Sequence, residues 1–305
     1  MPAARLLSGG VVAELYADQA AGLRRLFARE PLRVITFAAG SHGVGKSVLV
    51  ANVAACLAQQ GRTVLVLDEC TKRNVAACFG VSNRLDLLHV INRERSLSEV
   101  LQTAAPGVLV LPAAKAVKKL GKFDESQQSV LTSSLSAMED PVDVILVDAS
   151  QDHPLGFSPL GLAAHETVIV MSPTPASITD AYALIKKVSL GYARRNYRVL
   201  VNGVRGMDEG RSVFGNIARV THSRRFARLE FAGSVPLDER LHHAASLCKT
   251  VGTLYPDTPA AKAIRTLASD MLAWQIPDDD SGGLEQFVQQ LLHLSQHIDP
   301  VAIYA

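Results

Sequence analysis

The sequence predicts a doubly wound α/β fold, in which helices cover both faces of a mostly parallel β-sheet. Short apolar runs of strand length recur along the chain, and segments of helical length separate them. Strands that are apolar throughout are typical of parallel sheets buried on both faces. The runs that we assign to strands cover residues 33–38, 64–68, 108–112, 144–148, 167–171, 197–202 and 232–236.

A glycine-rich loop follows the first of these runs and opens a helix. Residues 40–47 read Gly-Ser-His-Gly-Val-Gly-Lys-Ser, which fits the pattern G-x-x-x-x-G-K-[ST] at every fixed position. An alanine-rich segment of helical length, residues 48–58, comes directly after the loop. A chance glycine turn before a helix is the alternative, and we disfavour it because both flanks also match. The sequence therefore predicts a P-loop NTPase fold.

The P-loop predicts binding of ATP or ADP together with Mg²⁺. Backbone N–H groups of Gly43, Val44 and Gly45 can converge on phosphate oxygens, and the N-terminus of the helix adds partial positive charge. Lys46 is expected to reach the β- and γ-phosphates, and the Ser47 hydroxyl is expected to ligate Mg²⁺.

Polar residues end several of the apolar runs. Asp68, Asp148 and Asn202 are the last residues of three of them, and ligands of open α/β sheets bind beyond the carboxyl ends of the strands. A P-loop protein needs an acid there to hold the Mg²⁺ shell. Asp148 is the first candidate for this metal ligand and Asp68 is the second. The alternative for each is an aspartate that only caps the following helix.

Composition limits the classes of protein to consider. The chain has 305 residues, 48% of them hydrophobic, so it can bury a large core, and its net charge of +2 argues against a general nucleic-acid binder. Its four cysteines form no C-x-x-C pair, which favours free thiols in a reducing cytoplasm. The N-terminus does not resemble a signal peptide, and no run approaches the roughly 20 apolar residues of a membrane span. We therefore expect a cytoplasmic protein, with peripheral contact at the inner face of the membrane left open.

Composition shifts divide the chain into four segments. The last helix has an apolar face that could dock on the domain, on a partner or on a membrane, and we favour packing because the helix holds no Lys or Arg. The lysine-rich stretch at 115–136 is expected to be a solvated helical face rather than a binding patch. The segments are 1–30 (a tail and a helix over 12–29), 31–275 (the nucleotide-binding domain), 276–283 (a linker) and 284–305 (an amphipathic helix and tail).

Several short motifs follow one another in a family-specific order. The most specific is SITDAYALIK at 177–186, and the others are DQAAGLR at 18–24, GVGKS at 43–47, LHVI at 88–91, SLSEVL at 96–101, VN at 201–202, VPLD at 235–238 and YPDTPAA at 255–261. Each motif is weak alone, but together they resemble the MinD/ParA class of P-loop ATPases over residues 14–275. More narrowly, the chain resembles the FlhG/FleN regulators of flagellar number.

The resemblance implies roles that the loop chemistry alone leaves open. Asn202 would read the adenine edge, and Pro236 and Asp238 would line the base pocket. The alternative for Asn202 is a turn residue after a strand.

The resemblance also implies partner proteins. In the family, the segment that matches 18–24 stimulates the SRP-type GTPase FlhF, which indicates Asp18, Gln19, Leu23 and Arg24 as partner-binding residues. A helix that only packs on its own domain is the alternative. Other partners in the family are a flagellar transcription activator and basal-body proteins, and relatives form nucleotide-dependent homodimers.

Three positions depart from the family pattern. The signature lysine of the P-loop, which reaches the phosphates of a partner subunit, is Ser41 here. The second aspartate of the first switch, which positions the attacking water, is Cys70, and Glu69 should point to the opposite face of the strand. The second switch lacks its usual glycine and reads DASQDHP from Asp148.

We therefore expect a regulator that binds nucleotide but hydrolyses ATP slowly or not at all. Asp68 and Asp152 are the remaining candidates for a catalytic role, and the loop histidine His42 is expected to be an exposed residue rather than a substitute for the missing lysine. One alternative is an active ATPase switch that cycles between an ATP dimer and an ADP monomer. A second is a ParA-like partitioning protein, against which the small net charge weighs.

Overall fold

The computed structural model describes residues 31–71, 74–81, 84–138, 142–153, 157–275 and 284–297, with only the backbone of Glu285 and of residues 295–297. The predictions for residues 1–30, including Asp18, Gln19, Leu23 and Arg24, lie outside the described residues. The predicted linker at 276–283 and the tail after residue 297 lie outside them as well. Every element named below belongs to the unit Leu32–Ala305.

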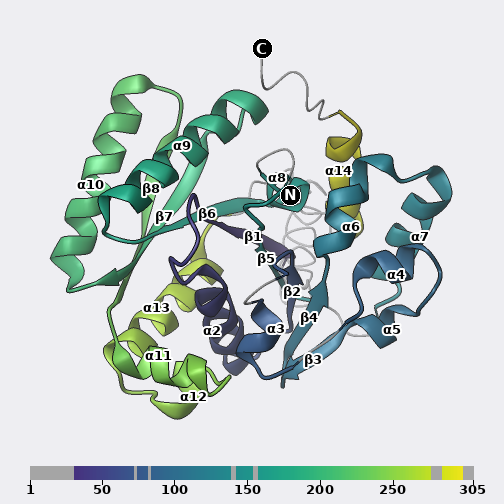
Figure 1. Cartoon of the computed structure of the whole chain (residues 1–305), viewed down its shortest axis with the longest axis horizontal. Helices are drawn as coiled ribbons and strands as arrows, with labels where there is room; N and C mark the ends of the chain where they lie inside the picture. Colours follow the sequence, from purple (N-terminus) through teal and green to yellow (C-terminus); the bar gives the residue numbers. More distant parts are fainter. Residues whose placement is uncertain are drawn as a thin grey trace, which may run out of the picture. The chain divides into compact units, whose positions relative to one another are not determined.

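Eight strands of the described chain form one sheet, which confirms the predicted fold class (Figure 1). Their order is β3-β4-β2-β5-β1-β6-β7-β8, and all neighbours are parallel except β3 and β4. The strands are β1 (Arg33–Ala38), β2 (Val64–Asp68), β3 (Gln102–Ala105), β4 (Val108–Pro112), β5 (Val144–Asp148), β6 (Glu166–Met171), β7 (Asn196–Val204) and β8 (Arg228–Pro236).

The strand that the sequence did not predict is β3. It has four residues, none of them fully buried, and it pairs antiparallel with β4 at one edge of the sheet. An edge strand exposed to water needs no apolar run, so the pattern that identifies the buried strands does not apply to it. The same reason explains why β8 begins earlier than predicted, because Arg228 and Glu230 are exposed at the opposite edge.

Helices cover both faces of this sheet (Figure 1). On one face, α2 (Lys46–Gln59) and α13 (Pro259–Ala273) share an apolar core with alternate strand residues such as Leu146. On the other face, α9 (Pro175–Tyr192), α10 (Met207–Arg224) and α14 (Leu284–His297) pack with the residues in between, such as Val147. The remaining helices are α3 (Val75–Cys78), α4 (Leu87–Ile91), α5 (Leu97–Val100), α6 (Ala114–Lys119), η1 (Leu120–Lys122), α7 (Glu125–Ser136), α8 (Pro159–Ala163), α11 (Glu239–Ser246) and α12 (Val251–Leu254).

The last helix, α14, packs on its own domain. Phe287, Val288 and Leu291 are buried against α7, α8 and η1. Burial of each side chain of this kind contributes about 2 kcal/mol, which accounts for docking of this face without a partner. No described helix is both long and apolar enough to cross a membrane.

The lysine-rich stretch divides into α6, η1 and α7. Lys115, Lys118, Lys119 and Lys122 are all exposed, while Val117 and Leu120 between them are buried. These lysines therefore lie on the solvated side of short helices, as the sequence predicts.

Candidate nucleotide-binding site

The glycine loop joins β1 to α2 at the carboxyl edge of the sheet. Gly45 immediately precedes α2 with a φ of 84°, a left-handed conformation that favours glycine. A Cβ atom on Gly45 would also lie 2.5 Å from Nδ2 of Asn202. The first turn of α2 holds no acidic residue, so its N–H groups and partial positive charge remain available to an anion.

Lys46, Ser47 and Asp148 meet at the base of this loop. The Lys46 ammonium donates to Oδ1 of Asp148, and the Ser47 hydroxyl donates to Oδ2 over 2.6 Å. Lys46 is 8% exposed and Asp148 is fully buried. Burial alone would lower the pKa of Lys46, but the charge of Asp148 and its hydrogen bond raise it overall, so the ammonium stays charged. The loop thus holds a buried cation beside a carboxylate.

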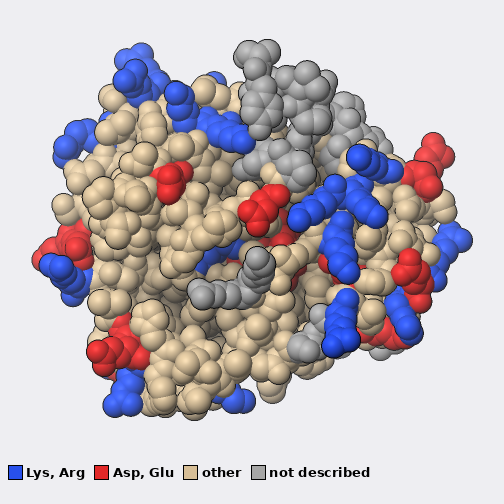
Figure 2. Space-filling model, viewed as in Figure 1, with Lys and Arg blue, Asp and Glu red and all other residues tan. Residues whose placement is uncertain are grey.

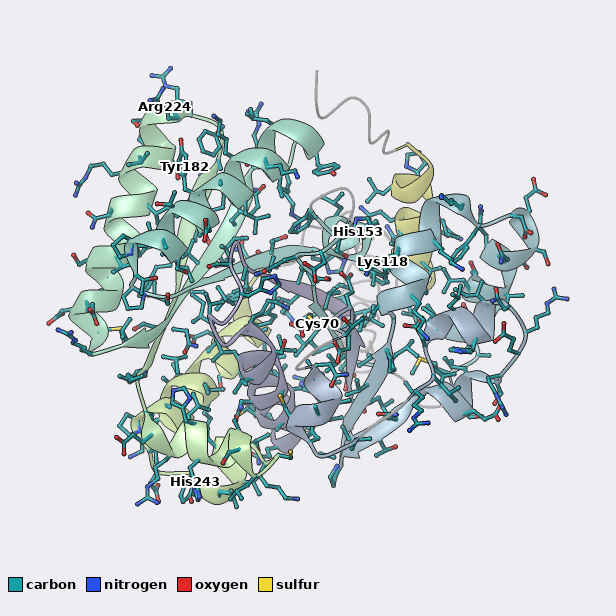
Figure 3. All side chains as sticks on the ribbon, in the orientation of Figure 1. Cys70, Lys118, His153, Tyr182, Arg224 and His243 are labelled. Atoms are coloured by element: carbon teal, nitrogen blue, oxygen red, sulfur yellow. The ribbon has the colours of Figure 1, made fainter. Side chains whose placement is uncertain are left out.

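Cys70, which stands where the resemblance leads us to expect an aspartate, contacts the same cluster (Cys70 is labelled in Figure 3). Its Sγ lies 3.6 Å from Nζ of Lys46 and 4.0 Å from Oγ of Ser47. Burial, and then the charge of Asp148, raise the pKa of the Cys70 thiol to about 12. The side chain is therefore a neutral thiol, which can neither accept a proton from water nor orient water as a carboxylate does.

Asp68 lies close to the cluster, but both of its carboxylate oxygens accept hydrogen bonds from backbone N–H groups. Oδ1 accepts from the backbone N–H of Cys70 over 3.0 Å, and Oδ2 accepts from that of Val75 over 2.7 Å. Asp68, Cys70 and Asp148 offer ligand atoms that all lie within 4.8 Å of one another. Because both oxygens of Asp68 hold the loop between β2 and α3, Asp148 is the stronger candidate for a direct metal ligand.

Glu69 is a buried residue whose role the sequence did not indicate. It is 2% exposed, and it contacts other residues than Cys70 does, which agrees with the strand alternation that the sequence predicts. Its Oε1 accepts from the hydroxyl of Ser158, and its Oε2 accepts from the backbone N–H of Ser150 over 2.9 Å. Glu69 therefore ties the first switch to the second switch and to α8. An acid between two site residues was the only signal in the sequence.

Replacing Glu69 by glutamine is expected to flatten the dependence of stability on pH. Burial raises the pKa of Glu69 from 4.5 to about 7. The folded state therefore binds more protons than the unfolded state between these values, and this carboxyl makes the protein less stable as pH rises through that window. Glutamine carries no charge, and its oxygen can accept from the backbone N–H of Ser150 while its amide N–H donates to the Ser158 hydroxyl oxygen, which reverses the direction of that bond. At pH 8 the variant should be more stable by up to about 3 kcal/mol.

Urea unfolding of the nucleotide-free protein between pH 5 and pH 8 measures this effect. Glu94→Gln, which changes an exposed glutamate, is the control and should follow the wild type. If Glu69→Gln and the wild type lose stability equally with rising pH, the carboxyl is already paired well enough to stay charged.

Two of the three residues that the resemblance assigned to base binding, Asn202 and Asp238, have hydrogen-bond partners within the protein. Asn202 Nδ2 donates to the Val44 carbonyl over 2.7 Å, which fixes the P-loop to β7. Asp238 accepts from the backbone N–H of Arg240 over 2.8 Å and of Ala260 over 3.2 Å, which joins α11 to α13. Pro236 ends β8 at the same edge of the sheet. All three lie on the expected side, and contact with a base stays a prediction.

The rim of the loop carries the other residues that depart from the family. Gln151 donates from Nε2 to the Ser41 carbonyl over 2.6 Å, and the Ser41 hydroxyl lies 3.5 Å from that of Ser177. His42 and Asp152 face each other over 3.6 Å, with 77% and 70% of their side chains exposed. His42 is thus the exposed loop residue that the sequence analysis favours, and Asp152 stands outside the buried cluster.

These residues fit a magnesium nucleotide. The loop offers backbone N–H groups and a buried ammonium for phosphates, which are anionic. Ser47 and Asp148 offer the hard oxygen ligands that Mg²⁺ prefers. Lys46 and Ser47 both donate hydrogen bonds to Asp148, so the three groups are close enough to act on one ligand.

Comparison with known proteins gives matches along most of the chain. The family model described as AAA domain matches residues 32–200. Antiactivator FleN from Pseudomonas aeruginosa is 31% identical over 273 residues, which are 88% of this chain and 97% of that protein. Flagellum site-determining protein YlxH from Helicobacter pylori is 26% identical over 85% of this chain and 90% of that protein.

The fold also matches solved structures. The septum site-determining protein MinD from Pyrococcus horikoshii, solved in complex with Mg-ADP, superposes with a TM-score of 0.55. It is 20% identical and covers 79% of this chain and 97% of its own. At this identity the likeness concerns the fold alone.

Proposed function

Because this chain belongs to the MinD/ParA-type P-loop ATPases, in the family that includes antiactivator FleN, we propose that it is a nucleotide-binding regulator of flagellar number or placement. It acts in the cytoplasm through partner proteins. FleN is named as an antiactivator and YlxH as a flagellum site-determining protein, and both cover most of this chain.

The observation that carries the nucleotide half of this proposal is the contact of Lys46 and Ser47 with Asp148. In the proposed complex, Lys46 would neutralise the β- and γ-phosphates of ATP, or the β-phosphate of ADP. Ser47 and Asp148 would hold the Mg²⁺, which would supply neutralisation of phosphate charge. The MinD structure that contains Mg-ADP supports this assignment by its common fold.

We further propose that the protein turns ATP over slowly or not at all. The Cys70 thiol lies where the family has a water-positioning carboxylate, and burial keeps that thiol neutral. Ser41 lacks the charge and length of the signature lysine. The nucleotide would then serve as a ligand that selects one conformation, or one homodimer, for the partner proteins.

Deleting the gene is the test of the flagellar role. In the encoding organism, the number or position of flagella per cell, counted by electron microscopy, should change. Expression of the intact chain should restore the wild-type count. An unchanged count and position in the deletion strain would overturn the flagellar proposal, whatever the chain does with nucleotide.

A peptide of residues 10–30 is expected to raise GTP turnover by the cognate FlhF-type GTPase. Gln19 can orient a water, and Arg24 can contact a phosphate or carboxylate. Replacing Gln19 by alanine in the peptide should reduce the stimulation. Phosphate release by the GTPase measures both effects. If the full chain stimulates and the peptide does not, the contact lies elsewhere in the chain.

A further inference from the structure

A basic groove lies at the end of the sheet opposite the P-loop. It has a volume of about 850 Å³ and is formed by the last turns of α10 and by the first residues of β7 and β8. The P-loop and Asn202 lie at the carboxyl ends of the parallel strands, whereas Asn196 and Arg228 begin β7 and β8. The groove is therefore separate from the nucleotide site.

Arginines from three different elements line this groove. They are Arg195 before β7, Arg219 on α10, Arg225 at the end of α10 and Arg228 at the start of β8, and His222 lies among them. All five are exposed. Figure 2 shows Lys and Arg side chains gathered at the upper left, over the ends of α9 and α10.

None of the described residues that line the groove is acidic. Among the described residues, no carboxylate lies within ion-pair distance of the four arginines, although Arg198 nearby pairs with Glu166 and Glu230. Glu230, the glutamate closest in sequence to Arg228, forms an ion pair with Arg198 over 2.7 Å instead. In a chain with a net charge of only +2, this is a local concentration of positive charge that no carboxylate of the described residues pairs with.

The groove also has an apolar wall in a fixed position. Ala218, Phe226 and Leu229 contribute to the lining. The rings of Phe226 and of Tyr182 on α9 pack edge to face, with 5.6 Å between their centroids (Tyr182 is labelled in Figure 3). Phe226 directly follows Arg225, which ends α10 in a left-handed turn with φ 56°. Both an arginine and an aromatic residue at this turn therefore line the groove.

We propose that this groove docks an acidic peptide segment of a partner protein, with at least one large apolar side chain. Arginine binds carboxylates through its planar, two-pronged guanidinium, and interface cores favour arginine and aromatic residues. In an extended peptide, alternate side chains point to opposite sides, so carboxylates can meet the arginines while apolar groups meet Phe226 and Leu229.

The concave shape of the groove and the distribution of its positive charge disfavour other anionic ligands. A membrane surface is flat on this scale, and the basic residues line a concave surface. A nucleic acid would need a basic track that follows its backbone, and its affinity would rise steeply as salt falls. The acidic-peptide assignment does not rest on nucleotide binding, since the groove and the P-loop lie at opposite ends of the sheet. It adds a second contact for a regulator that acts through partner proteins.

Fluorescence anisotropy with the full chain tests the proposal. The probe is a short labelled peptide in which glutamate alternates with leucine and phenylalanine. We expect saturable binding, weakened roughly tenfold or more in the double variant Arg219→Glu/Arg228→Glu. Arg224→Glu is the control, because Arg224 is an exposed arginine at the last position of α10 that does not line the groove. It should bind like the wild type.

Three outcomes would overturn the proposal. They are no binding of the peptide, equal binding by the double variant, and equal loss in the Arg224→Glu control.

Parallel titrations with a single-stranded oligonucleotide and with anionic lipid vesicles decide between ligand classes. If either binds through Arg219 and Arg228 more tightly than the peptide does, the groove serves that ligand instead. Thermal unfolding of each variant, which changes only exposed residues, checks that the fold is intact. Nucleotide affinity should be unchanged in all of them, so failure here leaves the P-loop proposal standing.

Discussion

Replacing Lys46 by alanine is expected to weaken ATP binding by about 2–4 kcal/mol, the range for losing one member of a close charge pair. Lys46 is the one buried cation beside Asp148 in the described site, and the loop around it offers only backbone dipoles to the phosphates. Isothermal titration calorimetry with Mg-ATP measures the loss. Lys115→Ala, which removes an exposed lysine from α6, should bind like the wild type.

A second variant separates binding from folding. Lys46→Ala leaves the fully buried Asp148 without its cation, which should also lower the free energy of unfolding by about 3–5 kcal/mol. The double variant Lys46→Met/Asp148→Asn removes both charges and should recover much of that stability without recovering affinity. Unchanged affinity in a folded Lys46→Ala protein would mean that the P-loop is a structural remnant.

Restoring the residues of the family pattern with the double substitution Cys70→Asp/Ser41→Lys is expected to raise ATP turnover by roughly 100-fold or more. A cation supplied to the transferring phosphoryl group is by itself worth about 10³–10⁵ in rate, and a positioned water adds to it. Cys70 already points at Lys46 and Ser47, so an aspartate there would enter the site without movement of the backbone. Phosphate release under saturating Mg-ATP measures the gain.

The matched control for this experiment is Cys70→Ser with Ser41→Lys. Serine has nearly the size of cysteine but no carboxylate, so the control should gain less than the restored pair. If the control gains as much, water positioning by a carboxylate does not limit turnover. If the native chain is already fast, an exposed group such as His42 or Asp152 supplies the missing function, and the expectation of slow hydrolysis is wrong.

The sequence predicted the parts of the fold that depend on buried apolar runs. It predicted seven of the strands, the helix after the P-loop, and the position of Asp148 and Asn202 at the carboxyl ends of their strands. The contact between Lys46 and Asp148 came only from the structure. The edge strand β3 was missed because its residues are half-exposed and small or polar. Local pattern carries no information on such a strand, whose place depends on pairing with β4.

Hydrogen-bond partners were the part that the sequence could not predict. Asp68 ends a strand just as Asp148 does, yet its oxygens hold the backbone of Cys70 and Val75. Glu69 bonds to Ser150 and Ser158, which lie 81 and 89 residues further along the chain. The basic groove likewise draws on residues 195–229, whose arginines are scattered in the sequence and meet only because β7 and β8 pair.

Titration of the purified chain with a fluorescent ATP analogue and Mg²⁺, with turnover measured on the same sample, tests the central claim most directly. The claim is that this chain keeps a working nucleotide site and has lost the means of fast hydrolysis. We expect saturable binding that requires Lys46, with turnover well below that of a relative that keeps the signature lysine and both switch aspartates. Absence of binding, or turnover as fast as that relative's, would contradict it.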